Sequence, residues 1–339
     1  MAEAGVARVV NAGIFISFTA ILLAGCAVAG KSAPAEAAYT AESTYQKLIG
    51  SYPFIQIARQ TLPANVKLLR DLPYVSREGK DLQLDLYSPV ASRVTGPTAR
   101  SAIVLVHGGG WRSGTRDNLG ALAIRLAERG YVCAAISYRL SAEARYPAAI
   151  HDVKAAVRWL RSQALLYHIK PDQIAVAGGS AGGQIAALVG VTNDMEKFDL
   201  AVSSTVPSAV QAVINIDGLS DFTSEEARKY EDDPSKKPSA AGAWLGGSYA
   251  EKTALWKEAS PLTHVSKDTP PFLFISSAQK RFSLGRDEMM ERMTALGIKT
   301  KAVHLPNTPH SFWLFDPWLG PTVDAIDEFL SAVFVRGQG

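Results

Sequence analysis

The chain has 339 residues, of which 47% are hydrophobic and 20% are charged, with a formal net charge of +3. This composition excludes an intrinsically disordered chain, and the basic residues form no stripe of the kind that binds nucleic acid. With two cysteines, Cys26 in an N-terminal targeting segment and Cys133 in an apolar run, the sequence offers no disulfide within the mature domain and no cysteine-based metal site.

The N-terminus has the pattern of a secretion signal. Residues Ile14–Leu23 form an apolar run that is too short to span a bilayer, and Leu23-Ala24-Gly25-Cys26 follows it. This sequence resembles a bacterial lipobox, which implies that Cys26 is lipidated and becomes the new N-terminus. A plain signal peptide or a chance cysteine is the alternative, and Arg8 as the only basic residue before the run weakens the pattern.

The domain boundaries follow from this interpretation. We expect a signal peptide over residues 1–26, a tether over 27–45 and one folded domain over 46–339. Acyl chains on Cys26 would anchor the domain to a membrane. Because Ala27 and not Asp follows the cysteine, resemblance to Gram-negative sorting favours a periplasmic or cell-surface location at the outer membrane.

Strand and helix patterns alternate through the rest of the chain. Residues 81–87 alternate apolar and polar positions, as expected of a half-buried edge strand, and short apolar runs predict buried strands. We predict these strands at 101–106, 131–137, 174–177, 210–216, 272–275 and 301–304, and helices at 119–129, 147–165, 181–189, 286–296 and 322–333. This order predicts an α/β fold with a mostly parallel, doubly wound sheet.

One long segment lacks a strand pattern. Residues 219–268 contain a charged stretch at 225–237 and then AWLGGSY. A long insertion between strands is often a functional loop or lid. We interpret it as a small cap over the site, with a surface excursion as the alternative.

Two glycine-rich motifs follow predicted strands. Residues 178–182 read GGSAG between a strand and a helix, the context of a nucleophile elbow that exposes Ser180 beside the N–H of Ala181. Residues 107–111 read HGGGW, and their glycines would let the N–H groups of Gly109 or Gly110 bind an oxyanion. A phosphate loop is the alternative for the second motif, but its Lys-Ser/Thr ending is absent.

A late histidine completes the chemistry. His310 follows the last predicted strand, and an imidazole can take the serine proton and give it to a leaving group. Together the motifs resemble the α/β-hydrolase fold, and more narrowly the esterase branch that includes feruloyl and acetyl esterases of polysaccharides. The resemblance covers about Tyr74 to Phe334, and the stretches RFSLGRDE and TPHSFWLFDPW are similar to a subgroup associated with pectin degradation.

The expected catalytic acid is missing from its usual place. The family pattern puts an aspartate shortly after the strand at 272–275, where this chain has Ser276-Ser277-Ala278-Gln279-Lys280. An acid must lie between Ser180 and His310 if the usual chain order holds. Asp217, which follows another strand, is our first choice, and Asp287 and then Asp221 are the alternatives.

The resemblance implies a serine esterase that needs no cofactor or metal. We expect acetyl or methyl esters of plant cell-wall polysaccharides such as pectin as substrates, bound by Trp111, Trp313, Arg281 and Arg286. An arginine there could pair with a uronate carboxylate. Packing of Trp313 in the core is the alternative for that residue, and a surface ion pair with Asp287 or Glu288 is the alternative for the arginines. The alternatives are a serine peptidase related to acylaminoacyl peptidases and an inactive α/β-hydrolase that serves as a binding module.

Overall fold

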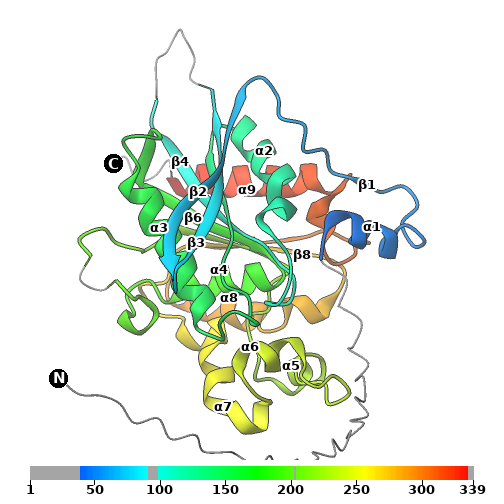
Figure 1. Ribbon diagram of the computed structural model, residues 1–339. Helices are drawn as coiled ribbons and strands as arrows, with labels where there is room; N and C mark the ends of the chain where they lie inside the picture. The colour runs from blue at the N-terminus through cyan, green and yellow to red at the C-terminus, as the bar shows by residue number, and fades with distance from the viewer. Residues whose placement is uncertain (1–38, 91–97, 202–203, 335–339) are drawn as a thin grey trace, which may run out of the picture. The chain divides into compact units, whose positions relative to one another are not determined.

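Eight strands form one mixed sheet in this computed structural model, which describes residues 39–90, 98–201 and 204–334 (Figure 1). The spatial order is β2-β3-β5-β4-β6-β7-β8-β9. From β5 to β9 all neighbours are parallel, whereas β2, β3 and β5 are antiparallel to one another in turn. The strands are β2 (Val66–Arg77), β3 (Lys80–Pro89), β4 (Arg100–Val106), β5 (Val132–Ile136), β6 (Ile169–Gly179), β7 (Ala212–Ile216), β8 (Phe272–Ser276) and β9 (Thr300–His304). The predicted mostly parallel sheet is confirmed.

The edge of the sheet differs from the prediction. The segment at 81–87 lies in β3, which is paired on both sides, and β2 is the edge strand instead. Strand β2 escapes detection because Arg70, Asp71 and Pro73 interrupt its apolar pattern, and its pairing with β3 is irregular at the same place. The prediction of a half-buried strand is also wrong, because residues 84–87 are all buried, so the alternation in this segment marks neither an edge nor a solvated face.

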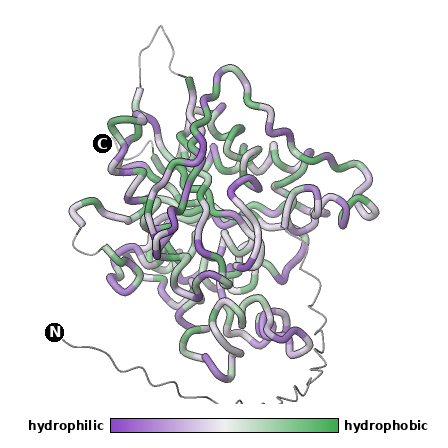
Figure 2. The backbone as a smooth tube through the Cα atoms, in the orientation of Figure 1, coloured by the Kyte–Doolittle hydropathy of each residue, from purple (hydrophilic) through white to green (hydrophobic). Residues whose placement is uncertain are grey.

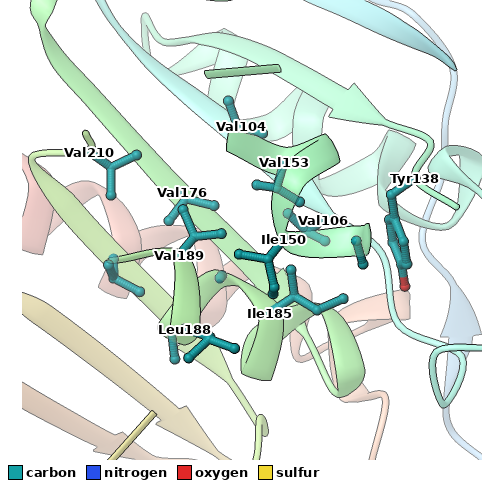
Figure 3. Packing of buried hydrophobic residues seen from close by; sticks show 14 of the residues in the cluster. Val104, Val106, Tyr138, Ile150, Val153, Val176, Ile185, Leu188, Val189 and Val210 are labelled. Carbon is teal, nitrogen blue, oxygen red and sulfur yellow. The ribbon is translucent and has the colours of Figure 1, made fainter. Parts of the chain in front are cut away.

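Helices cover both faces of the sheet. Side chains alternate along each strand, so in β4 Val104 and Val106 pack on one face, while Ile103 and Leu105 pack on the other. The first face is covered by α3 (Ala148–Ser162), α4 (Ala181–Val191) and α8 (Arg286–Ala295), and the second by α2 (Gly120–Glu128) and α9 (Leu319–Phe334). Figure 3 shows Ile150 and Val153 of α3 and Ile185 and Leu188 of α4 packed near Val104, Val106 and Val176 of the sheet. Figure 2 shows hydrophobic stretches in the central strands and also in the helices around them.

The insertion predicted at 219–268 consists of short helices. They are α5 (Glu225–Glu231), α6 (Ala240–Leu245) and α7 (Tyr249–Glu258), and they lie together between β7 and β8 in sequence (Figure 1). Serine side chains cap the three N-termini: Ser224, Ser239 and Ser248 accept hydrogen bonds from the backbone three residues on. Trp244 and Trp256 are fully buried and join the insertion to the main core.

The chain before β2 is partly ordered against the domain. The sequence predicts a tether through residue 45, but α1 (Ala41–Leu48) begins inside it, with Thr40 and Ser43 forming a capping box. β1 (Gln56–Ile57) then pairs with β10 (Phe315–Asp316). The predicted signal peptide, Cys26 and the tether up to residue 38 lie outside the described residues. Within those described residues, none of the helices has the length and hydrophobicity needed to cross a bilayer.

Candidate active site

Ser180 occupies the sharp turn from β6 into α4. Its backbone has φ 57° and ψ −125°, a conformation that is costly for a residue with a side chain. A hydrogen bond from Ser180 N to Ile216 O of β7, at 2.8 Å, fastens the turn to the neighbouring strand. Gly182 lets the start of α4 lie against the end of β4, because a Cβ atom there would lie 2.0 Å from the Val106 carbonyl oxygen. The turn therefore raises the serine at the carboxyl edge of the sheet.

His310 lies on the loop after β9 and reaches Ser180. Its Nε2 is 2.8 Å from Ser180 Oγ. The Phe282 ring stacks on the imidazole with centroids 3.4 Å apart and an 8° interplanar angle, and Trp313 meets it edge-on at 5.4 Å. These two rings hold the imidazole in the plane that brings Nε2 to the serine.

Asp217 lies where the histidine needs an acid, hydrogen-bonded to the ring nitrogen that faces away from Ser180. Its Oδ2 is 2.9 Å from His310 Nδ1, and its Oδ1 accepts a hydrogen bond of 2.8 Å from Ser277 N. The residue directly follows β7, has φ 49°, and is 2% exposed. The family's usual acid follows the strand that corresponds to β8. Because β7 lies between β6 and β8, a carboxylate after β7 can reach the same histidine.

The alternative acids are engaged elsewhere. Asp287 is exposed and paired with Arg286, and Asp221 accepts hydrogen bonds from the backbone of Thr223 and Ser224. Of the three acids considered from sequence, the structure joins Asp217 to His310 and Ser180.

The glycine-rich loop passes directly over the serine turn. A Cβ atom on Gly108 would lie 3.0 Å from Ser180 Cβ, so only glycine lets the two segments meet. Gly110 and Ala181 line the same pocket as Ser180, and Ala181 opens α4, where its N–H has no acceptor within the helix. Gly109 does not line this pocket; its carbonyl accepts hydrogen bonds from Arg112 N and Ser113 N and shapes the turn.

A pocket of about 120 Å³ opens in front of Ser180. The main domain contributes the residues around the serine, and the insertion contributes Leu219, Glu231 of α5 and Ala240 of α6. The insertion, which we call the cap, therefore forms part of the pocket wall. The lining residues are Gly110, Trp111, Ser180, Ala181, Asp217, Leu219, Glu231, Ala240, Arg281 and Phe282.

Two of the four residues predicted to bind substrate line this pocket. Trp111 is 5% exposed, stacks on Trp244 of the cap with centroids 5.0 Å apart, and donates from Nε1 to Gln184 at 2.9 Å. Arg281 donates to Glu231 at 3.1 Å, and its guanidinium lies between the Tyr230 and Phe282 rings.

The other two belong to the scaffold. Arg286 bonds Ser276 Oγ and Asp287 and does not line the pocket. Trp313 is 1% exposed beneath Gly179, where a Cβ atom would come within 2.5 Å of its ring. The prediction chose Trp313 because it follows His310 in sequence, and Arg286 because it stands near the usual position of the catalytic acid. Neither criterion reports the direction in which a side chain points.

The sequence analysis missed Glu231 and Phe282. Glu231 belongs to a charged stretch that resembles a solvated helix face, yet its side chain is only 12% exposed. Burial raises the pKa of Glu231, and the adjacent Arg281 opposes that rise. Phe282 stands in the RFSLGRDE stretch, where its contact with His310 has no local signal. The positions of both residues in the pocket depend on the folding of the cap and of the loop after β8, so the sequence alone does not predict them.

The arrangement can transfer an acyl group. A serine hydroxyl, an imidazole and a buried carboxylate form one hydrogen-bonded chain at the mouth of a pocket, beside a helix N-terminus. Among the described residues, no group of three His, Cys, Asp or Glu side chains is placed to hold a metal ion.

More than half of the chain matches a known protein family. The family model BD-FAE matches residues 84–282, which include the glycine-rich loop, the serine turn and the cap. The chain belongs to the BD-FAE family. It is 31% identical to Esterase LipC of Mycobacterium tuberculosis (strain ATCC 25618 / H37Rv) over 245 residues, which are 68% of this chain and 58% of LipC. The chain thus spans about three fifths of that relative.

Solved structures share the architecture of this BD-FAE family member. The Est2 esterase of the planctomycete Thermogutta terrifontis superposes with a TM-score of 0.63 at 25% identity, over 80% of this chain and 93% of Est2. A truncated carbohydrate esterase from gut microbiota gives a TM-score of 0.65 at 23% identity, over 81% of this chain and 99% of that one. The predicted α/β-hydrolase fold is confirmed.

Proposed function

We propose that this protein is a serine esterase that hydrolyses carboxylic esters through an acyl-enzyme on Ser180. The observation that carries the proposal is the hydrogen-bonded chain from Asp217 through His310 to Ser180 Oγ at the mouth of a pocket. The esterase names of LipC and Est2 support the same reaction class.

The reaction proceeds in two halves. Ser180 Oγ attacks the ester carbonyl while His310 Nε2 takes its proton, and the N–H groups of Ala181 and Gly110 stabilise the oxyanion. Asp217 orients the imidazole and stabilises its protonated form. Collapse of the intermediate breaks the bond to the alcohol oxygen, and His310 returns the proton to that alcohol. Water then attacks the acyl-enzyme by the same route and releases the acid.

The size of the pocket supports a small acyl group. Its volume of about 120 Å³ is well below the roughly 300–1,000 Å³ of pockets that enclose drug-sized ligands. An acetyl group fits such a space more readily than an aromatic feruloyl group. We therefore place acetyl esters first among the substrates considered from sequence.

The charges in the pocket support a neutral, hydroxyl-rich leaving group. The guanidinium of Arg281 is already paired with Glu231, so a second carboxylate such as a uronate would meet a neutralised cation. A sugar hydroxyl could instead donate to the Glu231 carboxylate. We therefore propose acetylated plant cell-wall polysaccharides, or their oligosaccharides, as substrates. Pectin, which the sequence resemblance supports, fits this charge argument where its uronates are methyl-esterified and therefore uncharged.

We also propose that a lipid on Cys26 holds the enzyme at the outer membrane, in the periplasm or at the cell surface. The support for this location is the lipobox-like sequence before Cys26. A tethered esterase would act on polymer fragments close to the membrane.

Release of acetate and of methanol from acetylated and methyl-esterified pectic oligosaccharides tests the proposed function. We expect acetate release that is lost in Ser180→Ala, and much slower methanol release. A peptide anilide assayed beside 4-nitrophenyl acetate tests the peptidase alternative. Faster cleavage of the anilide, or oligosaccharide binding without any hydrolysis, would contradict the proposal.

A further inference from the structure

Tyr39 connects the two loops that form the active site. Its hydroxyl donates to Ser311 Oγ at 3.0 Å, and Ser311 directly follows His310. Its carbonyl accepts from Asn118 Nδ2 at 3.1 Å, just beyond the glycine-rich loop. A Cβ atom on Gly114, at the end of that loop, would lie 3.3 Å from the Tyr39 ring. One residue from the start of the described chain thus touches both sides of the site.

The segment after Tyr39 continues along the histidine loop. We call residues 39–58 the N-terminal strap. Within it, β1 pairs with β10, and Ala58 N donates to Leu314 O at 2.9 Å. The Tyr45 ring meets Phe315, and the rings of Tyr52 and Phe54 meet Trp318 edge-on. The strap therefore covers the chain from Ser311 to Trp318, directly after the proposed general base.

The hydrogen-bonding partner of Ser311 affects the position of His310, because Ser311 is the next residue in the chain. It is 4% exposed and has φ 68°, the left-handed conformation that turns the chain right after His310. Among the described residues, Tyr39 is the hydrogen-bonding partner of its side chain. Burial raises the pKa of Tyr39 to about 12, so the phenol stays a proton donor throughout the pH range of an esterase assay.

We propose that Tyr39 is a positioning residue whose hydrogen bond to Ser311 fixes the His310 loop against the glycine-rich loop. The proposal rests on the proposed function, because it concerns the geometry of that reaction. It assigns a positioning role to a segment that precedes the sheet and contributes no reacting group. The strap would set the distance between the imidazole and the oxyanion-binding groups.

The test compares Tyr39→Phe and Ser311→Ala in the full chain. Each removes one end of the hydrogen bond while the strap keeps its ring contacts. We expect kcat for 4-nitrophenyl acetate to fall about fivefold in each, the worth of one ordinary hydrogen bond, with KM unchanged and the acid limb of the kcat profile shifted. The double variant should be no slower than either single variant, because both remove the same interaction.

Tyr45→Phe is the matched control, since it removes a hydroxyl from another strap tyrosine and should keep the wild-type kcat. Unchanged kcat and pH profile in Tyr39→Phe with only a lower Tm, or additive losses in the double variant, would overturn the inference. The rate of fluorophosphonate labelling provides a readout without an ester substrate. If the wild type labels and Tyr39→Phe labels equally fast, the positioning role fails while the serine mechanism stands; if the wild type does not label, both fail.

Discussion

Asp217 sits at 2% exposure with both carboxylate oxygens hydrogen-bonded, one to Ser277 N and the other to the His310 ring. An amide in its place keeps the shape but can present an N–H to the imidazole. This would favour the wrong tautomer and remove the charge that stabilises the imidazolium. The geometry therefore predicts that Asp217, and not Asp287 or Asp221, is the acid that orients His310.

We expect Asp217→Asn to lower kcat for 4-nitrophenyl acetate by about 10²–10⁴-fold, by analogy with triad aspartates of other serine hydrolases. Steady-state kinetics measures this change. Asp287→Asn is the control, because its carboxylate is exposed and pairs with Arg286, and it should retain wild-type kcat. A large loss in Asp287→Asn with little change in Asp217→Asn would reverse the assignment.

Glu231 provides a second prediction at the residue scale. If its carboxylate accepts a hydrogen bond from the leaving sugar, Glu231→Gln should lower kcat/KM for an acetylated sugar more than for 4-nitrophenyl acetate, which has no hydroxyl. The extra loss should be about tenfold, the lower end of the range for a hydrogen bond to a charged group. Equal losses on the two substrates would show that Glu231 does not distinguish the leaving groups.

The sequence predicts the reacting residues better than it predicts the residues around them. Ser180 and His310 stand in motifs whose strand and helix context is local, so their meeting could be predicted. Asp217 could be ranked first because it directly follows a buried strand. Trp313 is buried beneath the serine turn, and Arg286 begins α8 and bonds Ser276 and Asp287, so neither lies in the pocket. The sequence pattern does not record the direction of either side chain.

At the scale of elements, the glycine-rich loop carries a buried histidine. His107 is 2% exposed, stacks on Tyr138 and lies with Nδ1 2.8 Å from Gly108 O. Burial, rather than any neighbouring charge, is the main reason that the pKa of His107 falls to about 4. The ring is therefore neutral in the folded protein at physiological pH.

This shift predicts a dependence of stability on pH. Below a pH of about 6.5 the unfolded chain binds a proton at this histidine that the folded protein does not take up until about pH 4. The stabilisation is complete above the first value and is lost as the pH falls through the second, a change of roughly 3 kcal/mol. Urea unfolding of wild type and His107→Asn from pH 8 to 4 measures it. We expect the wild type to lose more stability than the variant, and parallel curves would contradict this account.

Helices and strands could be predicted where their sequence patterns are local, and were missed where they depend on distant parts of the chain. Strand β4 is a continuous apolar run, and the predicted range 101–106 agrees with the observed strand to within one residue. Strand β6 is predicted only over its apolar part, 174–177, because residues 170–173, which read KPDQ, interrupt the apolar pattern in the observed strand. β2 was missed because a bulged, polar edge strand depends on its partner for its structure, and periodicity cannot tell that β3 is paired on both sides. The cap helices begin at serine caps, but their contacts with the pocket depend on the folded chain.

At the scale of the whole molecule, the N-terminal strap links the proposed anchor to the catalytic domain. The tether predicted over residues 27–45 overlaps α1, because the small-residue composition of residues 30–38 does not continue into residues 39–45, which read YTAESTY. The capping pair Thr40 and Ser43 is the local sequence feature that favours a helix here. A capping pair alone does not predict an ordered helix, because a short helix also needs to pack against the domain.

The anchor gives a prediction of its own. When expressed with its signal in a Gram-negative host, the wild type should partition into the detergent phase of Triton X-114, because lipid on Cys26 adds acyl chains. Cys26→Ser should remain in the aqueous phase with unchanged kcat on 4-nitrophenyl acetate. Equal partitioning of the two proteins would contradict lipidation at this residue.

The most direct test of the account is the site and rate of fluorophosphonate labelling. We predict one adduct per chain, mapped by peptide mass spectrometry to Ser180, absent in Ser180→Ala and formed at least a hundredfold more slowly in His310→Ala. An adduct on another residue, or labelling of Ser180→Ala at the wild-type rate, would contradict the claim that Ser180 and His310 act together on a carbonyl group.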